Sequence, residues 1–120
     1  FVVSGPALLG DQLPDSHPSK KQAINFVTNF EKANGANSRN QFAGHAYDFQ
    51  IAMEKVIPVA MKSAKPGTPE FRMGIRDGLE TMGRTVFSHG VMNWTAKDHD
   101  GYTLETGVMT KVVDGKFIVQ

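Results

Sequence analysis

The spacing of apolar residues changes near Arg84, and this change constrains the fold more than any other feature of the sequence. In most of the chain before Arg84, apolar residues recur three and four positions apart, which is the period of an amphipathic helix. After it, they recur at every second position, which is typical of strands with one buried face. A chain of 120 residues that contains both periods predicts one α/β unit with one modest core.

Three helices are expected before the change of period, over residues 18–34, 46–64 and 68–83. Pro18 suits a first turn because its missing N–H would have no partner there, and Gly35 suits a helix end. Thr68 is the expected cap of the third helix, with Pro69 as its first residue. Pro58 lies within the second helix, where we expect a kink or a broken last turn.

The third expected helix carries two patterns at a spacing of four residues. Phe71, Ile75 and Leu79 predict a buried face. Gly74 and Gly78 predict that another element of the fold comes close, because a membrane contact does not suit so charged a segment.

Strands are expected at residues 1–4, 85–87, 91–94, 107–113 and 116–119. The first run, Phe1 to Ser4, is apolar and β-branched, which favours a buried strand. Asp114-Gly115 is the signal for a two-residue type I′ hairpin turn. That turn pairs Val112 with Phe117, and we expect both side chains on one buried face.

The composition excludes several classes of function. The net charge is +1, and the 13 basic and 12 acidic residues are scattered, so no basic stripe for nucleic acid forms. The absence of cysteine excludes disulfides, thiolate metal sites and cysteine nucleophiles. No apolar run approaches the ~18 residues of a membrane span.

His45 and Asp48 lie three positions apart at the expected start of the second helix. A His–Asp pair can orient an imidazole for general-base chemistry, which keeps a small hydrolase or isomerase open as an alternative. No residue in a matching nucleophile motif accompanies the pair. We therefore expect Asp48 to stabilise the positive end of the helix dipole and His45 to be a polar wall residue. No catalytic residue is assigned.

The segment Asp98–Gly101 has the composition of a metal-ligand cluster, yet adjacent residues in a turn seldom converge on one ion. It lacks the alternating oxygen ligands and distal Glu of a calcium loop. We expect a solvated turn there, and we predict neither a metal site nor a cofactor.

The stretch Asn40–Phe49 places small residues between aromatic ones ahead of a helix. Such a stretch can form the wall of an apolar ligand pocket, or it can seat the helix tightly against a sheet. Phe42 is therefore either a ligand-facing aromatic or a buried anchor.

Four further segments follow this stretch in a fixed order: Lys65–Arg72, Gly90–Met92, Asp98–Gly101 and Val112–Phe117. The ordered set resembles the C-terminal third of the periplasmic substrate-binding proteins of branched-chain amino acid ABC transporters, the leucine/isoleucine/valine-binding type. The resemblance covers nearly the whole chain, and it lies in the order of the segments rather than in any single motif.

This resemblance implies the two-lobed α/β fold of a type I periplasmic binding protein, with three crossover strands and a hinge motion that closes the lobes on a solute. Phe1 to about Gly35 and the final hairpin would belong to one lobe, and the helices within residues 46–83 to the other. Residues 1–120 would be one unit of a longer chain, since the sequence begins in a strand-like run without Met. Incomplete lobes expose apolar faces, so we expect the isolated chain to self-associate.

The resemblance also implies a function, which is capture of a solute for a membrane permease without chemistry. The solute would be an amino acid or a small carboxylate, including aromatic ones, and the protein would be periplasmic, with a signal peptide upstream of Phe1. In that family an aromatic residue five positions before a Tyr lines the cleft. Phe42 and Tyr47 keep this spacing, and the backbone of Ala43 would lie near the same cleft. The same fold also serves as a ligand-sensing domain of regulators and receptors, which stays the alternative.

Overall fold

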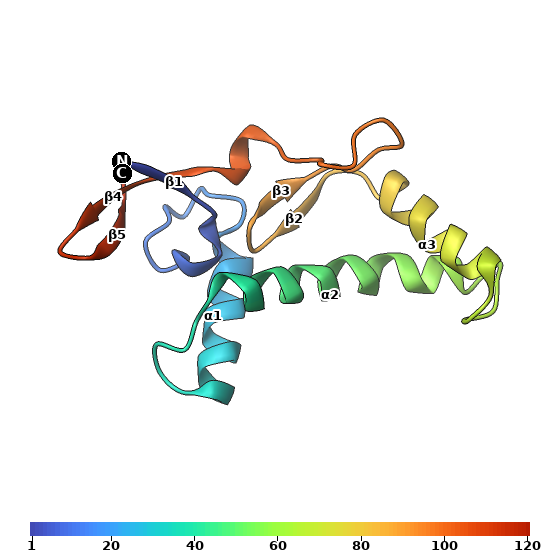
Figure 1. Ribbon diagram of the computed structural model, residues 1–120, viewed down its shortest axis with the longest axis horizontal. Coiled ribbons are helices and arrows are strands. Elements are labelled where there is room, and N and C mark those ends of the chain that lie inside the picture. The colour runs from blue at the N-terminus through green and yellow to red at the C-terminus, as the bar shows by residue number, and fades with distance from the viewer.

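The computed structural model describes residues 1–120, apart from the side chain of Glu105. The helices are α1 (Lys20–Asn34), α2 (Gln41–Ala60) and α3 (Pro69–Thr81), and the strands are β1 (Val2–Ser4), β2 (Thr85–Phe87), β3 (Gly90–Met92), β4 (Val108–Val113) and β5 (Lys116–Val119). Single-turn 3-10 helices lie at Pro6–Leu8 and Leu104–Thr106. The molecule is elongated, with extents of 52 × 33 × 22 Å, and both chain ends lie at the end opposite α3 (Figure 1).

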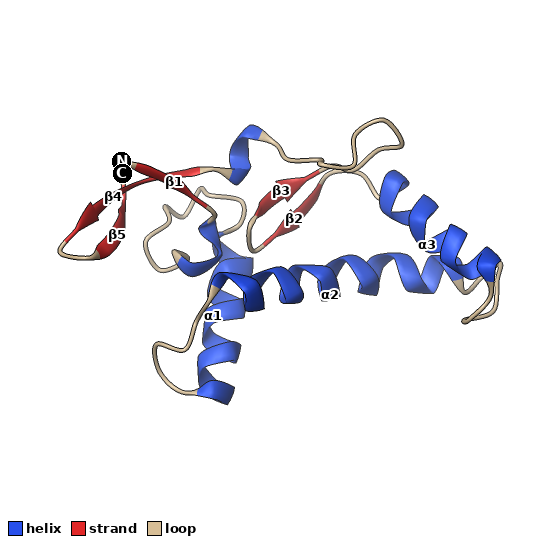
Figure 2. Cartoon of the chain, in the orientation of Figure 1, coloured by secondary structure: helices blue, strands red, loops and turns tan.

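The strands form two separate antiparallel sheets (Figure 2). One has the order β1–β4–β5, so that the first and last strands of the chain share a sheet, and the other is the β2–β3 hairpin. Three helices, short strands and a C-terminal hairpin confirm the predicted α/β class.

The C-terminal hairpin has the predicted register, with Val112 opposite Phe117. Asp114 and Gly115 have φ values of 48° and 75°, the left-handed conformation that a type I′ turn requires at both positions. The predicted burial is wrong, because Val112 and Phe117 are each about half-exposed. The base of the hairpin reaches the core through Val108, Thr110 and Val119, and the tip of the hairpin extends beyond it (Figure 1).

Strand β1 forms where predicted, but the expectation that it is buried is wrong. Val3 is 64% exposed and Val2 is also exposed. The reason is its position in the sheet, because β1 is an edge strand that pairs only with β4 within the described residues.

Helix α2 begins at Gln41, five residues earlier than predicted. The side chain of Asn40 caps it, accepting a hydrogen bond from the backbone N–H of Ala43 at 2.9 Å. The small residues that suggested an approach to the helix therefore form its first turn. The helix continues through Pro58 and ends at Ala60, four residues before the predicted end.

Helix α3 begins as predicted, with the Thr68 hydroxyl accepting a hydrogen bond from the backbone N–H of Phe71. Its expected buried face, which includes Leu79, is only half-buried, because α3 packs mainly against α2. The close approach predicted at the glycines is confirmed. A Cβ atom at Gly74 would lie 3.2 Å from the Cβ of Ala60, and one at Gly78 would lie 3.0 Å from the Cβ of Val56.

The buried side chains gather around two packing centres. The first consists of two clusters that share α1: Leu13, Ala23 and Val108 join it to the base of β4, and Ala7 and Phe26 join it to η1 (Pro6–Leu8), with Ala43 and Tyr47 of α2 packed against them. The second joins α2 to β2 and β3, with half-buried residues of α3 against it, and is built on Ala52, Phe87 and Met92.

Candidate ligand-binding site

Asp48 fixes the β2–β3 turn onto α2. Its side chain is only 7% exposed, and its carboxylate accepts hydrogen bonds from the backbone N–H groups of Ser88 at 2.7 Å and His89 at 3.0 Å. A third bond, 2.9 Å long, joins the carboxylate to Nδ1 of His89. Hydrogen bonds to an ionised acceptor are stronger than neutral ones. Asp48 therefore holds the turn, whereas the expected role at the helix dipole is wrong because the helix begins seven residues earlier.

The imidazole of His89 is held in one tautomer. A carboxylate can only accept, so Nδ1 carries the proton and Nε2 of the neutral ring carries a lone pair. His89 is 3% exposed, and its Nε2 has no hydrogen-bond partner among the described residues. The ring lies against two glycines, since a Cβ at Gly44 would be 2.6 Å from its Cε1 and one at Gly5 would be 3.0 Å from its Cδ2.

His45 stacks on His89. The ring centroids are 3.9 Å apart and the planes differ by 10°. One face of the His45 ring is thus covered, although the residue is exposed at its edge. This burial lowers the pKa of His45, as does repulsion from His89, and the nearby Asp48 carboxylate opposes both. The neutral form of His45 is therefore the favoured one.

The imidazole bonded to Asp48 belongs to His89 and not to His45, so the pair suggested by the sequence is replaced by one whose members lie 41 positions apart. The Ser88 hydroxyl lies 3.4 Å from Nδ1 of His89, on the same ring nitrogen as Asp48. A nucleophile–base–carboxylate relay needs the hydroxyl and the carboxylate on opposite ring nitrogens. Ser88 is also fully buried, so this arrangement positions a turn and does not prepare a nucleophile.

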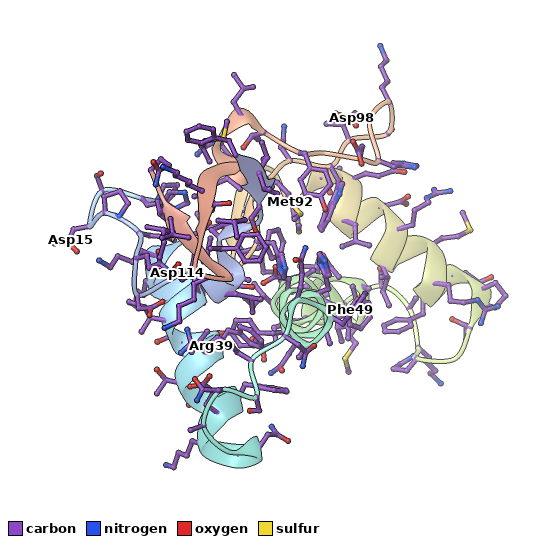
Figure 3. All side chains as sticks on the ribbon, turned by 60° about the vertical axis from the view of Figure 1, so that its left-hand side comes forward. Asp15, Arg39, Phe49, Met92, Asp98 and Asp114 are labelled. Carbon is purple, nitrogen blue, oxygen red and sulfur yellow. The ribbon has the colours of Figure 1, made fainter. Side chains whose placement is uncertain are left out.

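An apolar pocket of about 430 Å³ lies between α2, α3 and the segment that follows β3. Its apolar walls are Phe49, Ala52, Met53, Leu79, Met92 and Trp94. Figure 3 labels two of these, Phe49 on α2 and Met92 on β3. The polar rim includes Arg76, which pairs with Asp77, and Glu80, which is bonded to His99 at 2.9 Å. The pocket thus offers apolar area with few polar groups, the usual character of a small-molecule site.

A second, polar pocket of about 210 Å³ lies between the end of β1, the start of α2, the β2–β3 turn and the segment before β4. Ser4 and Gly5 reach it from the end of β1, Gln41 from α2, and Thr106 from the segment before β4. No Lys, Arg, Asp or Glu belongs to the part of its wall that the structure describes. Its wall also includes His89 and shares two residues with the apolar pocket, namely His45 and Tyr102. The two pockets therefore adjoin and form one composite site.

The three residues predicted to bind a ligand all lie in the first two turns of α2. Phe42 is 85% exposed and directly follows Gln41 of the polar pocket. Ala43 is half-buried against the first packing centre, and Tyr47 packs on Phe26 with ring centroids 5.7 Å apart. Among the described residues, none of the three lines either pocket. Their assignment to a ligand stays a prediction.

The remaining candidate segment behaves as expected of a solvated turn. The carboxylate of Asp98 accepts hydrogen bonds from the backbone N–H groups of Asp100 and Gly101, so the turn is closed by its own side chain. Within the described part of the chain, no three His, Cys, Asp or Glu side chains are arranged to hold a metal ion. None of the helices described is both long and apolar enough to cross a membrane.

No family model and no curated protein matches the sequence, but solved structures match it closely. An extracellular ligand-binding receptor from Rhodopseudomonas palustris HaA2 is 40% identical, with a TM-score of 0.89. A second such receptor, from Rhodopseudomonas palustris, is 37% identical with a TM-score of 0.89, and a third, from strain HaA2, is 32% identical with a TM-score of 0.86. Each alignment covers 98% of this chain and 33% of the receptor.

The sequence thus spans about one third of the length of the receptors that it matches. Over that third, this chain and the receptors share the order of helices and strands and the path of the backbone. Their sequence identities of 40% and 37% are higher than those at which a likeness shows the fold alone. The chain has the α/β fold of one segment of an extracellular ligand-binding receptor.

Proposed function

We propose that the chain is the solute-binding segment of a periplasmic receptor of the branched-chain amino acid ABC transporter type. The receptor captures a small solute and delivers it to a permease in the membrane, without chemistry on the solute. The likeness to extracellular ligand-binding receptors at up to 40% identity supports this proposal, as does the ordered set of motifs.

The composite pocket is the observation that carries the proposal. Its polar part lies between the end of β1 and the start of α2, and its apolar part borders the second packing centre. A hinge motion between β1 and α2 would change the polar part most, because its wall takes Ser4 and Gly5 from the end of β1 and Gln41 and His45 from α2. This is where a two-lobed receptor closes on its solute.

The dimensions and chemistry of the pocket favour a small amphipathic solute. A volume of about 430 Å³ for the apolar part lies within the range of small-molecule pockets, roughly 300–1,000 Å³. An apolar or aromatic body would fill this part, and a polar head would lie in the adjoining polar part. Amino acids and small carboxylates, including aromatic ones, have this shape.

The predicted ligand residues belong to the same proposal. Phe42 is exposed beside the polar pocket, so its ring is free to cover a solute when the lobes close. The backbone of Ala43 and the ring of Tyr47 lie one and five positions further along α2, and the family spacing is what supports their inclusion.

Titration calorimetry on the purified protein tests the proposal. The panel consists of leucine, phenylalanine, benzoate and phenylacetate, and we expect at least one of them to bind at one site. Trp94→Ala removes an apolar wall and should weaken that binding. Phe117→Ala removes an aromatic ring on the distant hairpin and should leave it unchanged. Absence of binding across the panel would contradict solute capture of this class.

A further inference from the structure

We infer that His45 is the residue that receives the carboxylate of the solute and that it takes up a proton in doing so, so that capture is coupled to pH. This inference rests on the proposed function and identifies the chemical group that the polar pocket recognises. It assigns a role to His45 that neither the sequence motifs nor the likeness to receptors supplies.

The composition of the polar pocket singles out His45. It has no Lys or Arg in its described wall, so His45 and His89 are the side chains there that can carry positive charge. His89 is buried, and its Nδ1 is occupied by Asp48. His45 is exposed at its edge, and it lines the apolar and the polar pocket alike. A solute with its body in the apolar pocket would bring its head group to this ring.

The groups around His45 leave it available to such a head group. The titratable side chains that face it are Asp48 of α2, His89 of the β2–β3 turn, Arg76 and Glu80 of α3, and Tyr102 and His99 of the segment after β3. The carboxylate of Asp48 already accepts three hydrogen bonds. Glu80 is bonded to His99 and Arg76 to Asp77. The anions near His45 thus make their hydrogen bonds to other groups, and Asp48 acts on His45 only through its charge, which raises the pKa of that ring.

The direction of the pH dependence follows from the pKa of His45 without and with a bound carboxylate. In the empty site, burial and the stacked His89 lower the pKa of His45, so the ring is neutral near neutral pH. A carboxylate beside it favours the charged form and raises the pKa. The complex therefore holds more protons than the free protein, and affinity for the solute increases as pH falls. Coupling to one proton can change the dissociation constant by at most about tenfold per pH unit.

Calorimetry in buffers of different ionisation enthalpy measures this proton uptake directly. At pH 7, the tightest carboxylate of the panel is titrated in phosphate and in Tris, together with its neutral amide. We expect a net uptake of protons for the carboxylate and none for the amide. From pH 8 to pH 6, the affinity for the carboxylate should increase several-fold, while that for the amide stays constant.

Two variants localise the effect. His45→Gln keeps a polar side chain of similar length and should abolish the proton uptake. His17→Gln removes an imidazole outside both pockets and should retain it. Equal thermal melting of the two variants shows that the fold is intact. Binding with unchanged proton uptake in His45→Gln would overturn this inference alone, whereas failure of every solute to bind would overturn the proposed function.

Discussion

Removal of the Asp48 carboxylate should be among the most destabilising single changes in this chain. The carboxylate connects α2 to the β2–β3 turn through two backbone N–H groups and one imidazole nitrogen. Asp48→Ala would leave these donors without a partner in a place that water does not reach freely. Unpaired buried donors cost more than the lost bonds themselves contribute.

The expected loss in the free energy of unfolding follows from the burial of Asp48 and from the number of hydrogen bonds that it accepts. A hydrogen bond to a charged group is worth roughly 1.5–3 kcal/mol when measured singly. The three bonds share one carboxylate, so their energies do not add. A buried donor left without a partner costs roughly 1–3 kcal/mol, and Asp48→Ala would leave three such donors around a side chain that is 7% exposed. We therefore expect a loss of about 3–5 kcal/mol, less than the full sum of the three. Asp48→Asn retains one acceptor oxygen, and we expect a loss of about 1–3 kcal/mol.

Urea denaturation followed by tryptophan fluorescence suits this measurement. The chain has one tryptophan, Trp94, and its ring packs against Phe87 of the second packing centre at 5.5 Å between centroids. Asp77→Ala is the matched control, because Asp77 is exposed and exposed pairs contribute about 0–1 kcal/mol. If Asp48→Ala unfolds at the same urea concentration as this control, the buried carboxylate does not hold the turn.

Three further outcomes follow from the same region. Gly44→Ala should lower the melting temperature despite the helix preference of Ala, worth about 1 kcal/mol, because its Cβ would lie 2.6 Å from the ring of His89; a higher melting temperature would contradict this contact. The fold lowers the pKa of His45. The stability that this residue contributes is therefore present above its usual pKa of about 6.5 and is lost as pH falls through the lowered value. Between pH 7 and pH 5, the free energy of unfolding should decrease less in His45→Gln than in the wild type. Phe42→Ala should weaken solute binding about tenfold, which corresponds to 1.4 kcal/mol, without a change in melting temperature; equal affinity would remove Phe42 from the site.

Local rules account for what could be predicted from the sequence. The start of α3 and the register of the last hairpin each depend on two adjacent residues, Thr68-Pro69 and Asp114-Gly115. The start of α2 was also encoded locally, in the side chain of Asn40, but the small residues after it suggested a loop. Backbone preferences of this kind act within a few positions and need no knowledge of the fold.

The site could not be predicted in the same way, because it depends on which distant segments meet. Asp48 and His89 are joined across 41 positions, and no local pattern selects His89 over the other histidines. The burial of β1 depends on how many strands flank it, which its own residues do not specify. The composite pocket takes its walls from α2, α3, the end of β1, the β2–β3 hairpin and the segment between β3 and β4, so its shape appears only after packing.

The ring of His89 and the two glycines beside it form a size-matched set. Gly5 precedes the 3-10 helix of the first packing centre, and Gly44 lies on α2, so the ring fills a space between parts of the chain that are distant in sequence. A larger residue at either glycine requires a smaller one at position 89, and a smaller ring leaves a gap that one added methyl group could fill. Natural variation at these three positions should therefore be correlated, with changes that occur in compensating pairs.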